Sequence, residues 1–128
     1  MRNEASSRNW PRWFEPRNRQ VGTWAFILNR VTAIGLTIYL VVHLIVLSKL
    51  TQGEAGYQSF LLLAKTPLIK FGELLVIAAG LIHGLNGVRI SLTSIGVGVQ
   101  KQKLIFAVIM LLAVCGSAYF GYRMFFTE

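Results

Sequence analysis

The sequence predicts an all-α membrane protein with three transmembrane helices. Two observations lead to this fold class: apolar residues make up 54% of the chain and are gathered in long blocks, and only 14% of the residues are charged. The length of the blocks fits a membrane, because a hydrocarbon core of roughly 30 Å requires about 20 mostly apolar residues in a helix. A spanning segment must satisfy its own backbone hydrogen bonds, so each block is predicted to be helical.

The 128-residue chain is expected to form one transmembrane domain over residues 23–126, preceded by a basic arm over residues 1–22. The predicted spans are 24–48, 71–92 and 104–126. The arm does not resemble a secretory signal, because no short apolar core with a small-residue cleavage site follows it.

The connections between the spans have their own signals. Residues 51–56 are polar and predict a turn, whereas Tyr57–Ala64 predicts a short helix at the membrane surface. Pro67 suits the first turn of the second transmembrane helix. Residues 93–102 contain Gly96 and Gly98 and are expected to form a loop.

The charge pattern predicts the topology. The net charge of +8 would favour nucleic acid in a water-soluble protein, but here no basic helix with interleaved aromatic residues stands apart from the apolar blocks. Lys and Arg collect on the cytoplasmic side of membrane proteins. One side holds the larger basic group, which is Arg2, Arg8, Arg12, Arg17, Arg19, Arg30, Arg89, Lys101 and Lys103. The N-terminus is therefore expected in the cytoplasm, the C-terminus outside, and the chain in the inner cell membrane.

Ionisable residues inside a membrane span are costly and indicate function. The chain has only two histidines, His43 in the first block and His83 in the second. With a rise of about 1.5 Å per residue, they differ in depth by roughly 10 Å. Metal–nitrogen bonds are only about 2 Å long, so these histidines cannot share one iron. If both bind haem, each needs a different haem and a second ligand from another chain.

Helical spacing places each histidine on a distinctive face. Counting about 100° per residue, the first block has a polar stripe of Asn29, Thr32, Leu36, Tyr39 and His43. The second has a stripe of small residues around its histidine: Gly72, Val76, Ala79, Gly80, His83 and Gly87. Small residues allow a flat macrocycle or another helix to come close.

Several structural explanations stay open for these residues. Either histidine could simply form a hydrogen bond between helices, and the glycines could serve ordinary helix packing. Arg30 could be an anchor at the end of its helix, and Glu73 is better explained as an interfacial or interhelical partner than as a proton carrier. The single cysteine, Cys115, cannot form an internal disulfide or a cluster of its own.

Two short motifs carry a family resemblance. Residues 26–35 read Phe-Ile-Leu-Asn-Arg-Val-Thr-Ala-Ile-Gly and resemble the motif Ser-Ile-Leu-His-Arg-(Ile/Val)-(Ser/Thr)-Gly. Residues 83–89 read His-Gly-Leu-Asn-Gly-Val-Arg and match His-x-x-x-Gly-x-Arg. Together, in this order on adjacent membrane helices, they resemble the cytochrome b membrane subunit of succinate dehydrogenase (succinate:quinone oxidoreductase). The resemblance covers about Trp24 to Leu92.

The resemblance implies roles for individual residues. It implies that His83 ligates haem b, that Arg89 contacts a haem propionate and that Arg30 lines the quinone site near the iron–sulfur subunit. Asn29 stands where the family has a histidine and is expected near a propionate or the quinone. His43 resembles the additional histidine of two-haem members, and so two haem b groups are expected, each shared with a partner subunit.

The sequence also departs from the family pattern: Phe26 replaces the quinone-contacting serine, and Ile90 stands where a histidine is common. The chain contains no flavin or cluster motif and thus no catalytic centre of its own. We interpret it as one half of a two-subunit anchor that works with a flavoprotein and an iron–sulfur subunit. A fumarate reductase anchor and a haem-free scaffold or small transporter subunit remain as alternatives.

Overall fold

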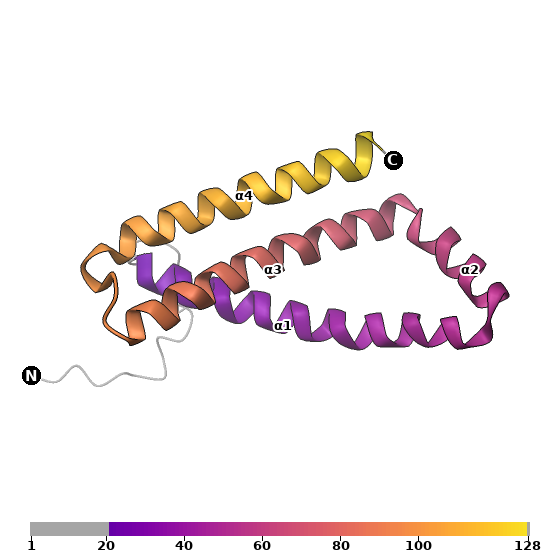
Figure 1. The fold of residues 1–128 in the computed structure, drawn as a ribbon, viewed down its shortest axis with the longest axis horizontal. Helices are drawn as coiled ribbons and strands as arrows, with labels where there is room; N and C mark the ends of the chain where they lie inside the picture. The colour runs from indigo at the N-terminus through magenta and orange to yellow at the C-terminus, as the bar shows by residue number, and fades with distance from the viewer. Residues whose placement is uncertain (1–20, 128) are drawn as a thin grey trace, which may run out of the picture.

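The computed structural model describes residues 21–127 and confirms the predicted class. Three long helices pack side by side and run alternately up and down: α1 (Val21–Ser48), α3 (Pro67–Ser94) and α4 (Gln102–Phe126). Each is long and apolar enough to span a membrane. Helix α3 lies between the other two, and the first turn of α1 lies at the same end as the α3–α4 connection (Figure 1).

Helices α1 and α3 approach closely near the start of α1 and separate toward the other end, where the short helix α2 (Glu54–Ala64) joins them (Figure 1). A 3-10 turn, η2 (Lys49–Gln52), links α1 to α2. Gly56 lies against this turn so closely that a Cβ there would overlap the backbone oxygen of Lys49. The predicted short helix is present as α2, but it starts three residues before Tyr57 and includes part of the predicted turn.

The transmembrane helices also extend beyond their predicted ends. Helix α3 begins at Pro67, as the proline predicted, four residues before the predicted apolar span; the preceding Thr66 is extended. It continues to Ser94, so the connection to α4 is shorter than expected. Gly96 and Gly98 adopt positive φ values of 86° and 73° in this connection, which ends in the 3-10 turn η3 (Val99–Lys101). The basic arm falls almost entirely outside the described residues.

Burial within residues 21–127 is inverted relative to a water-soluble protein. The buried apolar side chains are the small Ala25 and Ala113 together with Ile109, whereas Thr32, Asn86 and Arg89 are the buried polar ones. Large apolar side chains cover the outside of all three long helices. Lipid and partner helices can cover apolar surface, and polar groups in such a chain must find partners inside. The interior polar residues thus mark the place where the site should be sought.

Candidate functional site

The closest approach of α1 and α3 is built around Asn86, whose side chain is only 1% exposed. Its Nδ2 donates a hydrogen bond of 3.1 Å to the backbone carbonyl oxygen of Ala25. Ala25 is completely buried, and its small side chain allows the two backbones to come near each other. The Ala25 carbonyl also belongs to the backbone of α1, so its hydrogen bond with Asn86 joins the two helices without interrupting either of them.

Asn86 also orients Arg89, one helical turn further along α3. The Nε of Arg89 donates a 2.9 Å hydrogen bond to Asn86 Oδ1, and its guanidinium carbon lies 5.7 Å from the ring centroid of Phe106 on α4. Arg89 is only 8% exposed. A buried guanidinium needs partners for its five donors, and Asn86 supplies one of them. The remaining donors can meet an anionic group at this end of the bundle.

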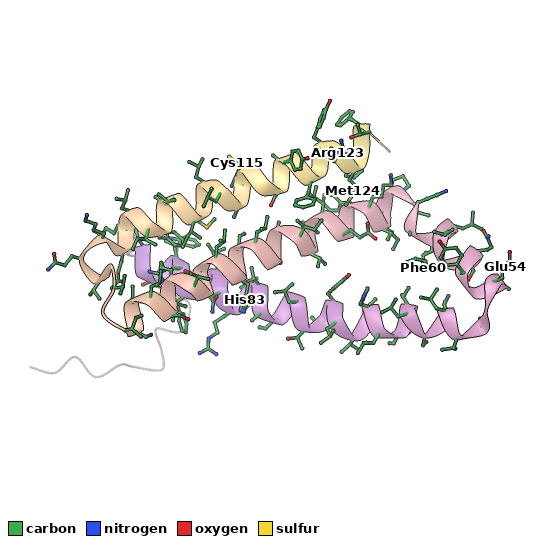
Figure 2. All side chains as sticks on the ribbon, in the orientation of Figure 1. Glu54, Phe60, His83, Cys115, Arg123 and Met124 are labelled. Carbon is green, nitrogen blue, oxygen red and sulfur yellow. The ribbon has the colours of Figure 1, made fainter. Side chains whose placement is uncertain are left out.

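His83 lies one turn before Asn86, at the crossing of α1 and α3 (Figure 2). Its Nδ1 is 3.2 Å from the backbone carbonyl oxygen of Asn29 and 3.3 Å from Thr32 Oγ1. The Thr32 hydroxyl itself donates to the backbone oxygen of Leu28, at 2.6 Å. Both groups facing Nδ1 are thus acceptors, since a carbonyl cannot donate and the hydroxyl proton is already used.

This arrangement determines the tautomer of His83. A neutral imidazole carries one N–H, and the two acceptors place it on Nδ1. Nε2 is then left with its lone pair available. Metal-ligating histidines are commonly held in this way, with the other ring N–H bound to a carbonyl or carboxylate. His83 could therefore bind a metal ion through Nε2.

Asn29 is brought to the same crossing, with its side-chain oxygen, Oδ1, buried and unpaired among the described residues. This acceptor requires an N–H or O–H donor. An ionised propionate has only acceptor oxygens, so it could use only the amide nitrogen of Asn29. A hydroxyl group of a reduced quinone could donate to Oδ1.

The small residues of α3 leave space beside His83. At Gly80, Gly84 and Gly87, an added Cβ would meet no described atom within 4 Å. Glycines on α4 behave differently: at Gly116 and Gly121 the added Cβ would lie 3.0 and 3.3 Å from leucine side chains of α3. The α4 glycines therefore serve packing within the chain, whereas those around His83 do not.

Two predicted site residues lie away from this crossing. Arg30 is exposed on α1, and its guanidinium carbon lies 5.1 Å from the ring centroid of Phe26, which is also exposed. His43 lies near the other end of α1, where its Nδ1 is 3.2 Å from Tyr39 Oη and the two rings stack with centroids 5.1 Å apart. The contacts of His83 place it level with Thr32, eleven residues before His43, which is about 16 Å along the helix.

His43 lines a mainly apolar cleft of about 580 Å³ between the diverging halves of α1 and α3. Tyr39 and Gly35 line it from α1, Gly72 and Ala79 from α3, and Phe60 from α2. Within residues 21–127 no group of three or more His, Cys, Asp or Glu side chains could hold a metal ion. His83 and His43 lie too far apart along the bundle to ligate one metal ion together.

Sequence reasoning missed the positioning residues. Asn86 was quoted within a motif but given no role, although its spacing of three residues from both His83 and Arg89 puts all three on one face of a helix. A carboxamide in an otherwise apolar span is itself a signal, because it needs a partner there. The contact of Thr32 with His83 could not be read from the sequence, since it depends on the depth at which the helices cross.

Comparison with known proteins gives consistent results. The family model for the succinate dehydrogenase/fumarate reductase transmembrane subunit matches residues 3–120. The chain is 33% identical over 105 residues to the succinate dehydrogenase hydrophobic membrane anchor subunit of Halobacterium salinarum, covering 80% of this chain and 78% of that protein. It is 29% identical over 108 residues to the succinate dehydrogenase 2 membrane subunit SdhC of Mycobacterium tuberculosis, covering 80% and 79%. No solved structure matches.

Proposed function

The chain belongs to the succinate dehydrogenase/fumarate reductase transmembrane subunit family, and we propose that it ligates haem b through His83 and forms part of the quinone site. As a succinate dehydrogenase membrane anchor subunit it associates with the other subunits of that enzyme. We propose that these are a second membrane anchor, an iron–sulfur subunit and a flavoprotein. Both relatives are named for succinate dehydrogenase, which favours succinate oxidation over fumarate reduction.

The observation that carries the haem proposal is the hydrogen bonding of His83. Its Nδ1 faces two acceptors, Asn29 O and Thr32 Oγ1, so Nε2 is free to bind iron. The free space over Gly80 and Gly87, on the same face of α3, supports a flat group beside it. Haem b would supply one-electron transfer within the membrane. The backbone of α1 would hold the imidazole in one orientation throughout.

Arg89 is proposed to neutralise a haem propionate. Its position supports this role, because Asn86 fixes Nε and leaves the terminal nitrogens to bind a carboxylate. Arg30 is proposed to face the quinone, since a guanidinium on a membrane helix requires a polar partner and, among the described residues, Arg30 contacts only the face of the Phe26 ring. Asn29 Oδ1 is a second polar group that a quinol hydroxyl could satisfy.

His43 is proposed to ligate a second haem b. The apolar cleft of about 580 Å³ beside it supports this, as does its stacking contact with Tyr39. If the Tyr39 hydroxyl accepts from Nδ1, Nε2 of His43 is left free, as in His83. The separation of about 16 Å along α1 requires two irons rather than one. Each would take its second ligand from the partner anchor subunit.

The proposed topology follows from charge. The basic arm and the α3–α4 connection would lie in the cytoplasm, next to the iron–sulfur subunit, and the C-terminus outside. The His83 and Arg89 region is at this end of the bundle, whereas His43 is toward the opposite end (Figures 1 and 2). The haem proposed on His83 would thus lie near the cytoplasmic side, where the iron–sulfur subunit delivers electrons.

A redox difference spectrum of the intact complex tests the proposal. The complex is purified through a tag on this chain, and haem is extracted and counted per copy. We expect a bis-histidine b-type spectrum and two haems, of which His83→Ala loses one. The matched control is Thr32→Val, which removes one contact to Nδ1 but retains the carbonyl and the iron ligand. A wild-type complex without haem would contradict the haem proposal and favour the haem-free scaffold. Full haem content in the assembled His83→Ala complex would contradict the role of His83 as a ligand.

A further inference from the structure

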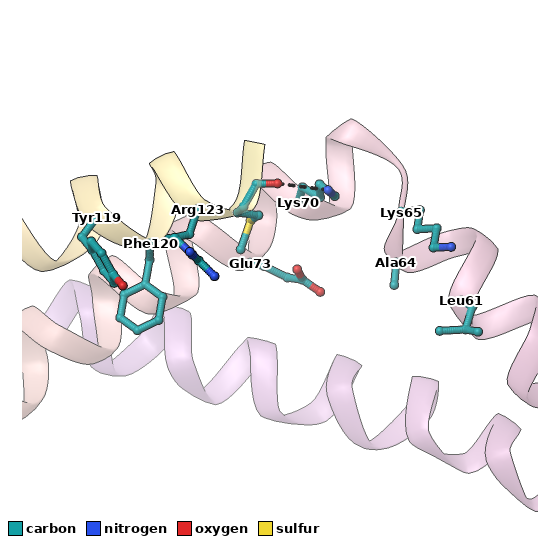
Figure 3. Close-up of a pocket in the computed structure, with 9 residues that line it drawn as sticks. Leu61, Ala64, Lys65, Lys70, Glu73, Tyr119, Phe120 and Arg123 are labelled. Atoms are coloured by element: carbon teal, nitrogen blue, oxygen red, sulfur yellow. Dashed lines mark hydrogen bonds between the residues drawn. The ribbon is translucent and has the colours of Figure 1, made fainter. Parts of the chain in front are cut away.

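A cleft that contains four charged side chains lies at the other end of the bundle from Arg89. It is bordered by α2, the start of α3 and the end of α4, is open on one side, and has a volume of about 800 Å³ (Figure 3). We call it the α2–α4 cleft and define it by its lining residues: Leu61, Ala64, Lys65, Lys70, Glu73, Tyr119, Phe120, Arg123 and Met124. None of the residues proposed to bind haem or quinone belongs to it.

The charge of this cleft is positive. Lys65, Lys70 and Arg123 contribute three cations and Glu73 one carboxylate, which leaves a net charge of +2. Lys70 is partly engaged, because its Nζ donates a 3.0 Å hydrogen bond to the backbone oxygen of Met124 at the end of α4. The side chains of Arg123 and Glu73 are directed into the same space between the helices (Figure 3). A ligand here should therefore be anionic and should also offer a donor to the carboxylate.

The depth of the cations matches the membrane surface. Lys70 is three residues after the first residue of α3, and Arg123 is three residues before the last residue of α4. At about 1.5 Å per residue, both lie within roughly 5 Å of the ends of their helices. Tyr119 and Tyr122, both exposed on the last turns of α4, are residues that favour the same level of a bilayer.

The walls of the cleft are apolar. Leu61 and Ala64 contribute from α2, and Phe120 and Met124 from α4. An inorganic anion would use the cations and leave these walls uncovered. An anionic phospholipid uses both, because its phosphate sits at the surface while its acyl chains follow apolar helices into the membrane. The polar head of a glycerol-bearing lipid also has hydroxyl donors for Glu73.

We propose that the α2–α4 cleft binds one anionic phospholipid, with its anionic head group among the cations Lys65, Lys70 and Arg123. The lipid lies between α2 and α4, and its head group neutralises the positive charge that these helices bring together. This role gives the three cations a function that the positive-inside rule does not explain, because they lie at the end of the bundle predicted to face outward.

Lipid retention by the intact complex tests this proposal. The delipidated complex is incubated with phosphatidylglycerol or with neutral phosphatidylcholine, and the lipids that remain bound after exchange are counted by native mass spectrometry. We expect one phosphatidylglycerol per copy of this chain and no equivalent phosphatidylcholine. Replacing two interfacial cations, in Lys65→Gln with Arg123→Gln, should weaken retention roughly 30-fold. Both side chains are exposed, so this variant should still assemble.

The matched control is Lys49→Gln, which removes an exposed cation at the same end of the bundle but outside the cleft. It should retain the lipid like the wild type, and inorganic phosphate in excess should not displace the lipid. Equal retention of the two lipids, or unchanged retention by the double variant, would overturn the proposal. Displacement by inorganic phosphate would also overturn it, since the cleft would then be a site for a free anion.

Discussion

The contact between α1 and α3 should depend strongly on one side chain, Asn86. The substitution Asn86→Leu retains a side chain of comparable size but removes two hydrogen bonds: Nδ2 to Ala25 O, and Arg89 Nε to Oδ1. An interhelical hydrogen bond in a membrane protein contributes on average about 0.6 kcal/mol and at most about 1.7. A hydrogen bond to a charged group contributes about 1.5–3 kcal/mol.

The two terms add up to a loss of about 2–5 kcal/mol for Asn86→Leu, because Arg89 is also left buried with an unpaired Nε. A loss of about 2 kcal/mol corresponds to a roughly 30-fold change in an equilibrium ratio. The assay heats the detergent-solubilised complex and follows the assembled fraction by size-exclusion chromatography. Ser94→Ala is the control on the same helix, because the Ser94 hydroxyl bonds only to its own helix at Ile90 O and the residue is exposed. Equal stability of the two variants would refute the reasoning.

Three further predictions concern the proposed sites and topology. His43→Leu should lower the haem count from two to one per copy while leaving the His83 haem spectrum intact, and an unchanged count would assign His43 to helix contacts alone. Arg30→Leu should impair quinone reduction far more than succinate oxidation by a soluble dye; if both activities fell together, Arg30 would be needed for assembly instead. A cysteine introduced in place of Arg17 should resist membrane-impermeant reagents in intact cells, whereas labelling from outside would contradict the cytoplasmic position of the arm.

The fold was predictable because a membrane imposes few solutions on long apolar blocks. The three spans were located correctly, and the ends at Ser48 and Phe126 agree with the structure. The errors lie where polar residues continue a helix: Lys70 and Thr93 lie just outside the predicted apolar span 71–92, yet both are helical. Polar side chains at the membrane surface remain hydrated, so they do not force a helix to end. Hydropathy therefore detects the apolar core of a helix more reliably than its ends.

Some residues that meet at the α1–α3 crossing were predictable, but the contacts between them were not. The spacing of Asn29 and Thr32 put both on one face of α1, and they do contact His83. The contacting atom of Asn29 is its backbone oxygen, however, which no residue type could have indicated. The depth difference between the histidines was underestimated, at roughly 10 Å against about 16 Å along α1. The estimate of roughly 10 Å assumed that the ends of α1 and α3 lie at similar depths. The point where the two helices cross in fact determines which residues of α1 and α3 lie side by side.

The way in which α1 and α3 diverge explains why one pair of helices can carry two different sites. At their close approach, Asn86 and Ala25 leave no room between the backbones, so α1 supplies only hydrogen-bond acceptors to His83. A group bound there must lie outside the α1–α3 contact, over the free faces of Gly80 and Gly87. Beyond Thr32 the helices separate, and the cleft beside His43 lies between them. Among the described residues, a group on His83 would be covered only on its α1 and α3 sides, whereas one on His43 would have α1, α2 and α3 around it. It follows that loss of the partner anchor subunit should release the first group more readily than the second.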